Sequence, residues 1–306
     1  MVGGMNPKVV ASECCAALHP QNTLRGFQFC LDSGVDGIEF DVHLSQDGHV
    51  VVQHDYLLNR RTTRNPSGQW LQTKGPAICD LTLAQLKEHD VGRYESGSHE
   101  EKSYPNYLAA DGEQIPTLEE LLRAHQLAGS DAELWIELKT TPFDRVLSSE
   151  PNELLTAVLK LVEEFGVVAK TILLAFEWQL LIDANRICPG IGLDYLTINP
   201  TFIKQLYRHK GTINPEDMYL PLDPSAYGNS MPETIAAAGG GWWGPYVADV
   251  TTEDVKLSHD CGVRVNLWGV ESSDQTIEKA LLLDADAITL SDSPLLQSKF
   301  LQSKLL

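Results

Sequence analysis

The chain has little positive charge and nothing that resembles a membrane anchor. Its 306 residues include 23 Lys and Arg against 42 Asp and Glu, a formal net charge of −19. This balance argues against nucleic acid or an anionic membrane as a partner, because both bind basic patches. No apolar run is long enough to span a bilayer, and the start lacks the basic-then-apolar form of a signal peptide. We therefore predict a cytoplasmic protein with no stable membrane insertion.

Paired cysteine motifs, internal repeats and low-complexity tracts are also lacking. The six cysteines show no CxxC pair and no small-scaffold spacing, so free thiols are predicted. A chain of this length can bury a large core, and α/β barrels of this size are often a single domain. We predict one domain over residues 1–306.

Short β-rich runs alternate with helical patterns along most of the chain. The predicted strands are Val9–Ser12, Gly37–His43, Leu134–Lys139, Thr171–Phe176, Gly192–Leu196, Trp242–Val247, Val263–Trp268 and Ala285–Leu290. The predicted helices are Asn22–Ser33, Thr117–Ala128, Asn152–Phe165, Glu177–Ile187, Met231–Ala238, Thr252–Cys261 and Ser273–Leu283. This alternation implies parallel β-α units, and eight of them predict a (β/α)8 TIM barrel with its active site at the carboxyl ends of the strands.

One long segment interrupts the alternation. Between His54 and Pro116 the chain is polar and rich in Gly and Pro, and only Thr82–Glu88 has a helical pattern. A structureless loop this long is uncommon in a compact domain unless it is functional or folds as a subdomain. Aromatic residues of this segment could line a substrate cleft or simply pack the insertion.

Charged residues stand where buried parallel strands should be apolar. Glu39 and Asp41 alternate along one predicted strand and point to one side. A turn and a second short strand then lead to His54, while Glu137 and Lys139 end the next barrel strand. Three carboxylates suit Mg²⁺ or Ca²⁺, and an imidazole beside them suits proton transfer. The alternative is a set of buried ion pairs that stabilise the barrel mouth.

These motifs resemble the glycerophosphodiester phosphodiesterase family over almost the whole chain. The E-x-D of Glu39 and Asp41, the V-V-Q-H-D ending at Asp55, and the P-Q-N-T of residues 20–23 carry the resemblance. The tryptophan Trp268 and the S-D-S-P of residues 291–294 add to it.

The resemblance implies a hydrolase that releases an alcohol and glycerol phosphate, with a small insertion at residues 55–116 over the barrel mouth. It also implies a divalent metal on Glu39, Asp41 and Glu137. His54 then takes one acid/base role, Lys139 contacts the phosphate, and Trp268 is a wall of the substrate cleft.

The first strand departs from the family pattern. Where the family has H-R-G, this chain has Ser12-Glu13-Cys14. A serine hydroxyl cannot replace an imidazole as proton donor, and Arg to Glu changes the local charge by two units. At ~5 Å and an effective dielectric of ~20 this change could reach ~6 kcal/mol against an anion, less in an open, solvated mouth. Possible compensations are His19 entering the vacant position, or Glu13 acting as acid/base or as a fourth carboxylate on the metal. Packing is the favoured role of Cys14.

Three hypotheses about function follow from these residues. The first is a metal-dependent phosphodiesterase in which His54 is paired with an altered second half made of Ser12, Glu13 or His19. The second is a barrel enzyme that acts on a neutral or cationic non-phosphate substrate, with Glu13 as acid/base. The third is a non-catalytic homologue that binds a small molecule and retains the metal and the cleft. Turnover of a phosphodiester, turnover of another substrate, or binding alone distinguishes them.

Overall fold

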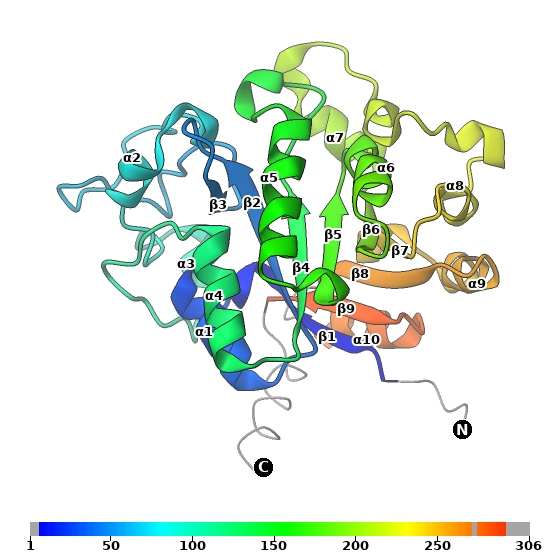
Figure 1. Ribbon diagram of the computed structural model, residues 1–306, viewed down its shortest axis with the longest axis horizontal. Helices are drawn as coiled ribbons and strands as arrows, with labels where there is room; N and C mark the ends of the chain where they lie inside the picture. Colours follow the sequence, from blue (N-terminus) through cyan, green and yellow to red (C-terminus); the bar gives the residue numbers. More distant parts are fainter. Residues whose placement is uncertain (1–5, 271–273, 292–306) are drawn as a thin grey trace.

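Eight parallel strands close into a barrel in the computed structural model, which describes residues 6–270 and 274–291 (Figure 1). The strands are β1 (Lys8–Ala11), β2 (Gly37–Leu44), β3 (Val50–Val52), β4 (Glu133–Leu138), β5 (Thr171–Ala175), β6 (Gly192–Thr197), β7 (Trp242–Pro245), β8 (Arg264–Val270) and β9 (Ala287–Leu290). Their order is β1-β9-β8-β7-β6-β5-β4-β2-β3, and a further pairing of β1 with β2 closes the ring. Strand β3 is antiparallel to β2 and lies outside the ring. The predicted TIM barrel is confirmed.

Helices connect successive strands on the outside of the barrel (Figure 1). The helices of the described residues are α1 (Leu24–Ser33), α2 (Leu83–Lys87), α3 (His99–Ser103), α4 (Leu118–Ala128), α5 (Pro151–Glu164), α6 (Trp178–Ile187), α7 (Pro200–Leu206), α8 (Met231–Ala237), α9 (Thr252–Asp260) and α10 (Asp274–Leu282). Of these, α2 and α3 belong to the segment between β3 and α4. The start of α4 follows from its sequence. Thr117 accepts a hydrogen bond from the Glu120 backbone, and the Glu120 side chain accepts one from the Thr117 N–H, the capping box that T-L-E-E predicts.

The segment that interrupts the alternation folds around a small apolar cluster of its own. This cluster contains Val51, Leu58, Ile78, Leu86, Val91 and Ile115. The helix predicted at Thr82–Glu88 is present as α2, with Thr82 as its cap. The bounds of a subdomain at 55–116 stay a prediction.

Two features of the chain were not predicted from sequence. The insertion contains the five-residue helix α3, and α7 with three short 3₁₀ turns occupies the connection between β6 and α8. Both helices are too short to produce a clear 3.6-residue pattern.

Two predictions fall outside the described residues. They are the S-D-S-P motif beyond its first residue, Ser291, and the predicted helix start at Ser273. Within the described part of the chain, no helix combines the length and apolar character that a membrane span requires.

A buried polar chain crosses the barrel interior. The Asn266 amide donates to Asp194 Oδ2 at 2.8 Å, and the Thr289 hydroxyl donates to Asn266 Oδ1 at 2.9 Å. Asp194 is fully buried, and its Oδ1 has no hydrogen-bond partner among the described residues. Burial raises the pKa of Asp194 to about 7, although the Asn266 hydrogen bond opposes the shift. The folded chain therefore retains this proton at a pH where the unfolded chain has lost it.

Replacing Asp194 with asparagine should make stability less dependent on pH. Because the folded-state pKa lies above the unfolded value of 3.8, the parent loses stability as pH rises from about 4 to about 7, by on the order of 4 kcal/mol. The side-chain amide of the Asp194→Asn variant cannot ionise, so the melting temperature of the variant relative to the parent should increase across that window. Thermal denaturation between pH 4 and 8 in EDTA checks this. Parallel pH profiles for the two proteins would contradict it.

Candidate active site

Acidic residues from two neighbouring strands meet at the barrel mouth, the end of the barrel that the carboxyl ends of the parallel strands form. Strand β2 carries Glu39 and Asp41, β4 carries Glu137, and Asp41 is the register partner of Glu137. Because alternate residues of a strand share a side, the three carboxylates point the same way. Their ligand oxygens all lie within 4.8 Å of one another. The predicted convergence is confirmed.

Lys139, directly after β4, supplies a positive charge to this cluster. Its Nζ lies 2.9 Å from Glu137 Oε1 and 3.2 Å from Asp41 Oδ1. Burial acts to lower the pKa of Lys139, but the two carboxylates outweigh burial and hold the pKa well above its usual value. The lysine is therefore a permanent cation at this position.

One cation does not neutralise these three carboxylates, of which Glu39 and Asp41 are buried and Glu137 is half-buried. Burial, with Asp41 and Glu137 nearby, raises the pKa of Glu39 well above its usual value, and burial also raises the pKa of Glu137. For Asp41, burial acts to raise the pKa, but Lys139 and His54 outweigh it and the pKa is lowered. Crowded carboxylates whose like charges oppose ionisation favour a divalent ion, and an oxygen-only donor set of this kind can hold one.

Backbone and amide groups hold the carboxylates in place. Asn22 donates from Nδ2 to Asp41 Oδ2 at 2.8 Å and accepts from the Asp41 N–H at 3.1 Å. Glu39 Oε2 accepts from the Glu13 N–H at 2.8 Å and from the Ser12 hydroxyl at 3.2 Å. Hydrogen bonds of this kind orient metal-binding carboxylates in proteins. Asn22 is thus a site residue that sequence reasoning had noted only as part of a motif.

His54 follows β3 and faces the cluster from the hairpin side. Its Nδ1 lies 3.0 Å from Asp55 Oδ1, and Asn59 donates to Asp55 Oδ2 at 2.6 Å. Lys139 and burial act to lower the pKa of His54, but Asp41, Glu13 and Asp55 together outweigh them and raise it to about 10. The imidazole side chain is 43% exposed. His54 is therefore placed to exchange protons with a molecule in the mouth.

Glu13 enters the same space from the 3₁₀ turn η1 (Ser12–Cys14). Glu13, Cys14 and Cys15 all have positive φ, at 47°, 57° and 69°, a conformation that is uncommon for residues other than glycine. Burial raises the pKa of Glu13 to about 7, while His54 opposes the shift. The ligand atoms of Glu13, Asp41 and His54 lie within 4.8 Å of one another. The first-strand segment therefore contributes a fourth carboxylate.

Two other candidates occupy different surroundings. The His19 ring is buried and lies 4.6 Å from the Phe29 ring, centre to centre, and its Nδ1 has no hydrogen-bond partner among the described residues. No contact described in the structure joins His19 to the carboxylates. Cys14 is also buried, and burial raises the pKa of its thiol well above the usual value. Its position agrees with packing, and all six cysteines are free thiols.

Ring contacts and hydrogen bonds hold the aromatic side chains of Trp268 and Tyr56. Trp268 of β8 packs against Phe176 and Tyr246, with ring centres 5.6 and 5.0 Å away, and its Nε1 donates to the Gly244 carbonyl. Tyr56 donates its hydroxyl to the Thr140 carbonyl at 2.9 Å. Trp268 is partly exposed, and its role as a wall of the substrate cleft stays a prediction.

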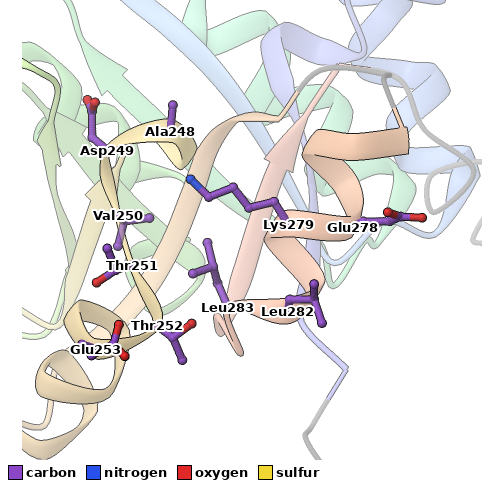
Figure 2. Close-up of a pocket in the computed structure, with 10 residues that line it drawn as sticks. All are labelled: Ala248, Asp249, Val250, Thr251, Thr252, Glu253, Glu278, Lys279, Leu282 and Leu283. Carbon is purple, nitrogen blue, oxygen red and sulfur yellow. The ribbon is translucent and has the colours of Figure 1, made fainter.

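A separate pocket of about 670 Å³ lies between the segment 247–253 and α10 (Figure 2). Lys279 extends across it and donates to the Val247 carbonyl at 2.6 Å. None of the lining residues belongs to the carboxylate cluster. We assign this pocket no part in the chemistry.

The fold and the site place this chain in the class of TIM-barrel enzymes, which bind and convert their substrates at the carboxyl ends of the strands. The carboxylates and the lysine of this chain gather at that end. Comparison with known proteins identifies the family within this class. The model of the glycerophosphoryl diester phosphodiesterase family matches residues 14–295, and the chain belongs to this family.

Individual relatives agree with the family assignment. A glycerophosphodiester phosphodiesterase from Bacillus altitudinis is 29% identical over 281 residues, which cover 92% of this chain and 93% of that protein. One from Caldanaerobacter subterraneus subsp. tengcongensis is 30% identical over 58% of this chain and 61% of its own length. A structure from Silicibacter pomeroyi, assigned to glycerophosphoryl diester phosphodiesterases, is 28% identical with a TM-score of 0.81, over 97% of this chain and 93% of that one.

Replacing Asn22 with Gly should weaken binding of a divalent ion. Asn22 has a φ of 55°, which glycine adopts without strain, so the change removes the amide that holds Asp41 and keeps the backbone. We expect Mg²⁺ or Ca²⁺ affinity to fall about 10- to 100-fold, measured by isothermal titration calorimetry. Asn229→Gly, also at positive φ (64°) but exposed, is the matched control. Equal affinities in all three proteins would rule out this role of Asn22.

Proposed function

We propose that this protein is a divalent-metal-dependent phosphodiesterase that hydrolyses a glycerophosphodiester to an alcohol and glycerol phosphate. The observation that carries the proposal is the Glu39–Asp41–Glu137 triad with Lys139 beside it, in a chain of this family. The partner is accordingly a small-molecule substrate. The cytoplasmic location stays a prediction.

Glu39, Asp41 and Glu137 would hold the ion. Mg²⁺ and Ca²⁺ are the ions that an all-oxygen set of carboxylates with room for water suits. When bound, the ion would supply positive charge that binds the phosphate and lowers the pKa of the hydroxyl that attacks phosphorus. Lys139 would hold a non-bridging phosphate oxygen, because its ammonium group is permanently charged and lies beside the triad.

His54 and Glu13 would move the protons. A hydroxyl of the glycerol moiety attacks phosphorus and gives its proton to the Glu13 carboxylate, while the phosphorus–oxygen bond to the alcohol breaks. His54 donates a proton to the oxygen that leaves, and water then opens the resulting cyclic phosphate with the two roles reversed. Trp268 forms a wall for the substrate, and the Ser12 hydroxyl orients Glu39. His19 would take part only if it left its contact with Phe29.

A second candidate function has one observation in its favour. Glu13 places a negative charge where the family resemblance expects an arginine, and a carboxylate there favours a neutral or cationic substrate over an anion. Such an enzyme would use the same metal and the same acid/base pair on a substrate without phosphate.

Hydrolysis assays distinguish these two candidates. Glycerophosphocholine and glycerophosphoethanolamine are incubated with the protein in Mg²⁺ or Ca²⁺, with EDTA as control, beside a Ser12→His, Glu13→Arg double variant. The proposal expects turnover by the unmodified chain that EDTA abolishes. A silent parent and an active double variant would show that the scaffold is intact but the chain has left phosphodiester chemistry.

Glu13→Gln should reduce kcat on the phosphodiester. The amide is nearly isosteric and leaves the Glu13 N–H to hydrogen-bond Glu39, but it cannot accept a proton, and loss of one acid/base group typically costs about 10²- to 10⁴-fold in rate. Steady-state kinetics at saturating Mg²⁺ checks this. Glu88→Gln, which changes an exposed residue, is the control. A Glu13→Gln enzyme with the parental kcat would remove Glu13 from the proton pathway.

A further inference from the structure

Two groups of ligand atoms share one carboxylate at the mouth. Glu39, Asp41 and Glu137 make the first group, and Glu13, Asp41 and His54 make the second. The first offers only oxygen, whereas the second includes an imidazole nitrogen. A carboxylate shared between two ligand groups is an arrangement that can serve two cations at once.

His54 has the hydrogen-bonding partners of a metal-binding histidine. Asp55 lies 3.0 Å from Nδ1 and is itself held by Asn59. A carboxylate on one ring nitrogen orients the ring so that the other nitrogen, here Nε2, can bind a metal ion in place of its proton. Metal-binding histidines almost always have such a partner on the second nitrogen. The contact with Asp55 involves neither Glu13 nor Asp41, the two carboxylates of the second group.

The Glu13 carboxylate still lacks a partner. In the described part of the chain, no side chain or backbone group forms a hydrogen bond or an ion pair with it, although the neighbouring Glu39, Asp41 and Glu137 all have one. The Glu13 N–H, not its carboxylate, is the group that contacts Glu39. The side chain is therefore available as a ligand without disturbing the first group.

Charge also favours a second cation. Four carboxylates, those of Glu13, Glu39, Asp41 and Glu137, share this space with a single lysine, Lys139. One divalent ion on the first group, together with Lys139, brings three positive charges to four carboxylates. A second cation on the second group would supply further positive charge and would take the place of a proton on His54.

We propose that Glu13, Asp41 and His54 form a second cation site that binds borderline transition-metal ions such as Zn²⁺ or Co²⁺. The imidazole nitrogen decides the selectivity, because nitrogen ligands suit these ions, whereas Mg²⁺ and Ca²⁺ prefer oxygen alone. The first group then binds hard ions such as Mg²⁺ or Ca²⁺, and the neighbouring second group binds borderline ions.

Occupancy of this second site opposes proton transfer by His54. The lone pair that binds the ion is the one that would carry a proton, so the imidazole cannot do both. This consequence rests on the proposed function, in which His54 is an acid/base group. A transition-metal ion would then inhibit the enzyme that Mg²⁺ or Ca²⁺ activates.

Binding of Co²⁺ to the full chain in saturating Mg²⁺ tests the site directly. The visible absorption of bound Co²⁺ and calorimetry report affinity and stoichiometry without any need for catalysis. We expect one Co²⁺ that Mg²⁺ does not displace, and at least a tenfold loss of its affinity in Glu13→Gln and in His54→Gln. Glu88→Gln should bind as the parent does. Circular dichroism shows whether each variant is folded. Because Glu13 and His54 lie on different elements, either variant still tests the site if the other does not fold.

The outcomes separate this site from the proposed function. Co²⁺ that Mg²⁺ displaces completely, or that binds both site variants with parental affinity, would overturn the second site whatever the enzyme hydrolyses. Selective loss in both variants would support it even for a chain with no phosphodiesterase activity. Where the parent is active, Co²⁺ should reduce its activity by half at the same concentration that half-saturates the site. Full activity at saturating Co²⁺ would contradict the competition between the ion and a proton for His54.

Discussion

The contact of Lys139 with Asp41 and Glu137 is the interaction on which the barrel mouth depends. Without a cation between them, these two carboxylates on adjacent strands would repel each other in a region of low dielectric. Their register pairing leaves them no freedom to separate. Lys139 neutralises only part of this negative charge. The arrangement of carboxylates that favours the lysine therefore also favours binding of a metal ion. Stability of the mouth and affinity for a cation therefore have one origin.

The first loop of the barrel is organised by its backbone. Glu13, Cys14 and Cys15 are left-handed in succession, and the Cys14 carbonyl approaches α1 so closely that a Cβ at Gly26 would lie 2.4 Å from it. This close packing brings the Glu13 N–H to Glu39 and Asn22 to Asp41. The loop thus positions two metal-site carboxylates through groups that side-chain motifs do not reveal.

Sequence patterns predicted the barrel and the convergence of Glu39, Asp41 and Glu137, because strand alternation and parallel register place residues with simple geometry. They did not predict the hydrogen bonds of Asn22, which require a left-handed residue and a partner 19 positions away. Helix α7 was missed because seven residues give little periodicity. Asp194 also stands in a buried strand, but its role was missed because that role depends on Asn266 and Thr289 from other strands.

The backbone contact between Glu13 and Glu39 has a consequence for how such a site can change over time. Since the peptide N–H makes the contact, side chains that tolerate a φ of 47° could stand at that position without loosening the carboxylates, whereas β-branched residues and proline could not. Substitutions at this residue alter the charge and proton chemistry offered to a substrate while the supporting framework persists. The loop is therefore a place where new specificity can arise by single substitutions, provided that the new residue adopts the left-handed backbone conformation.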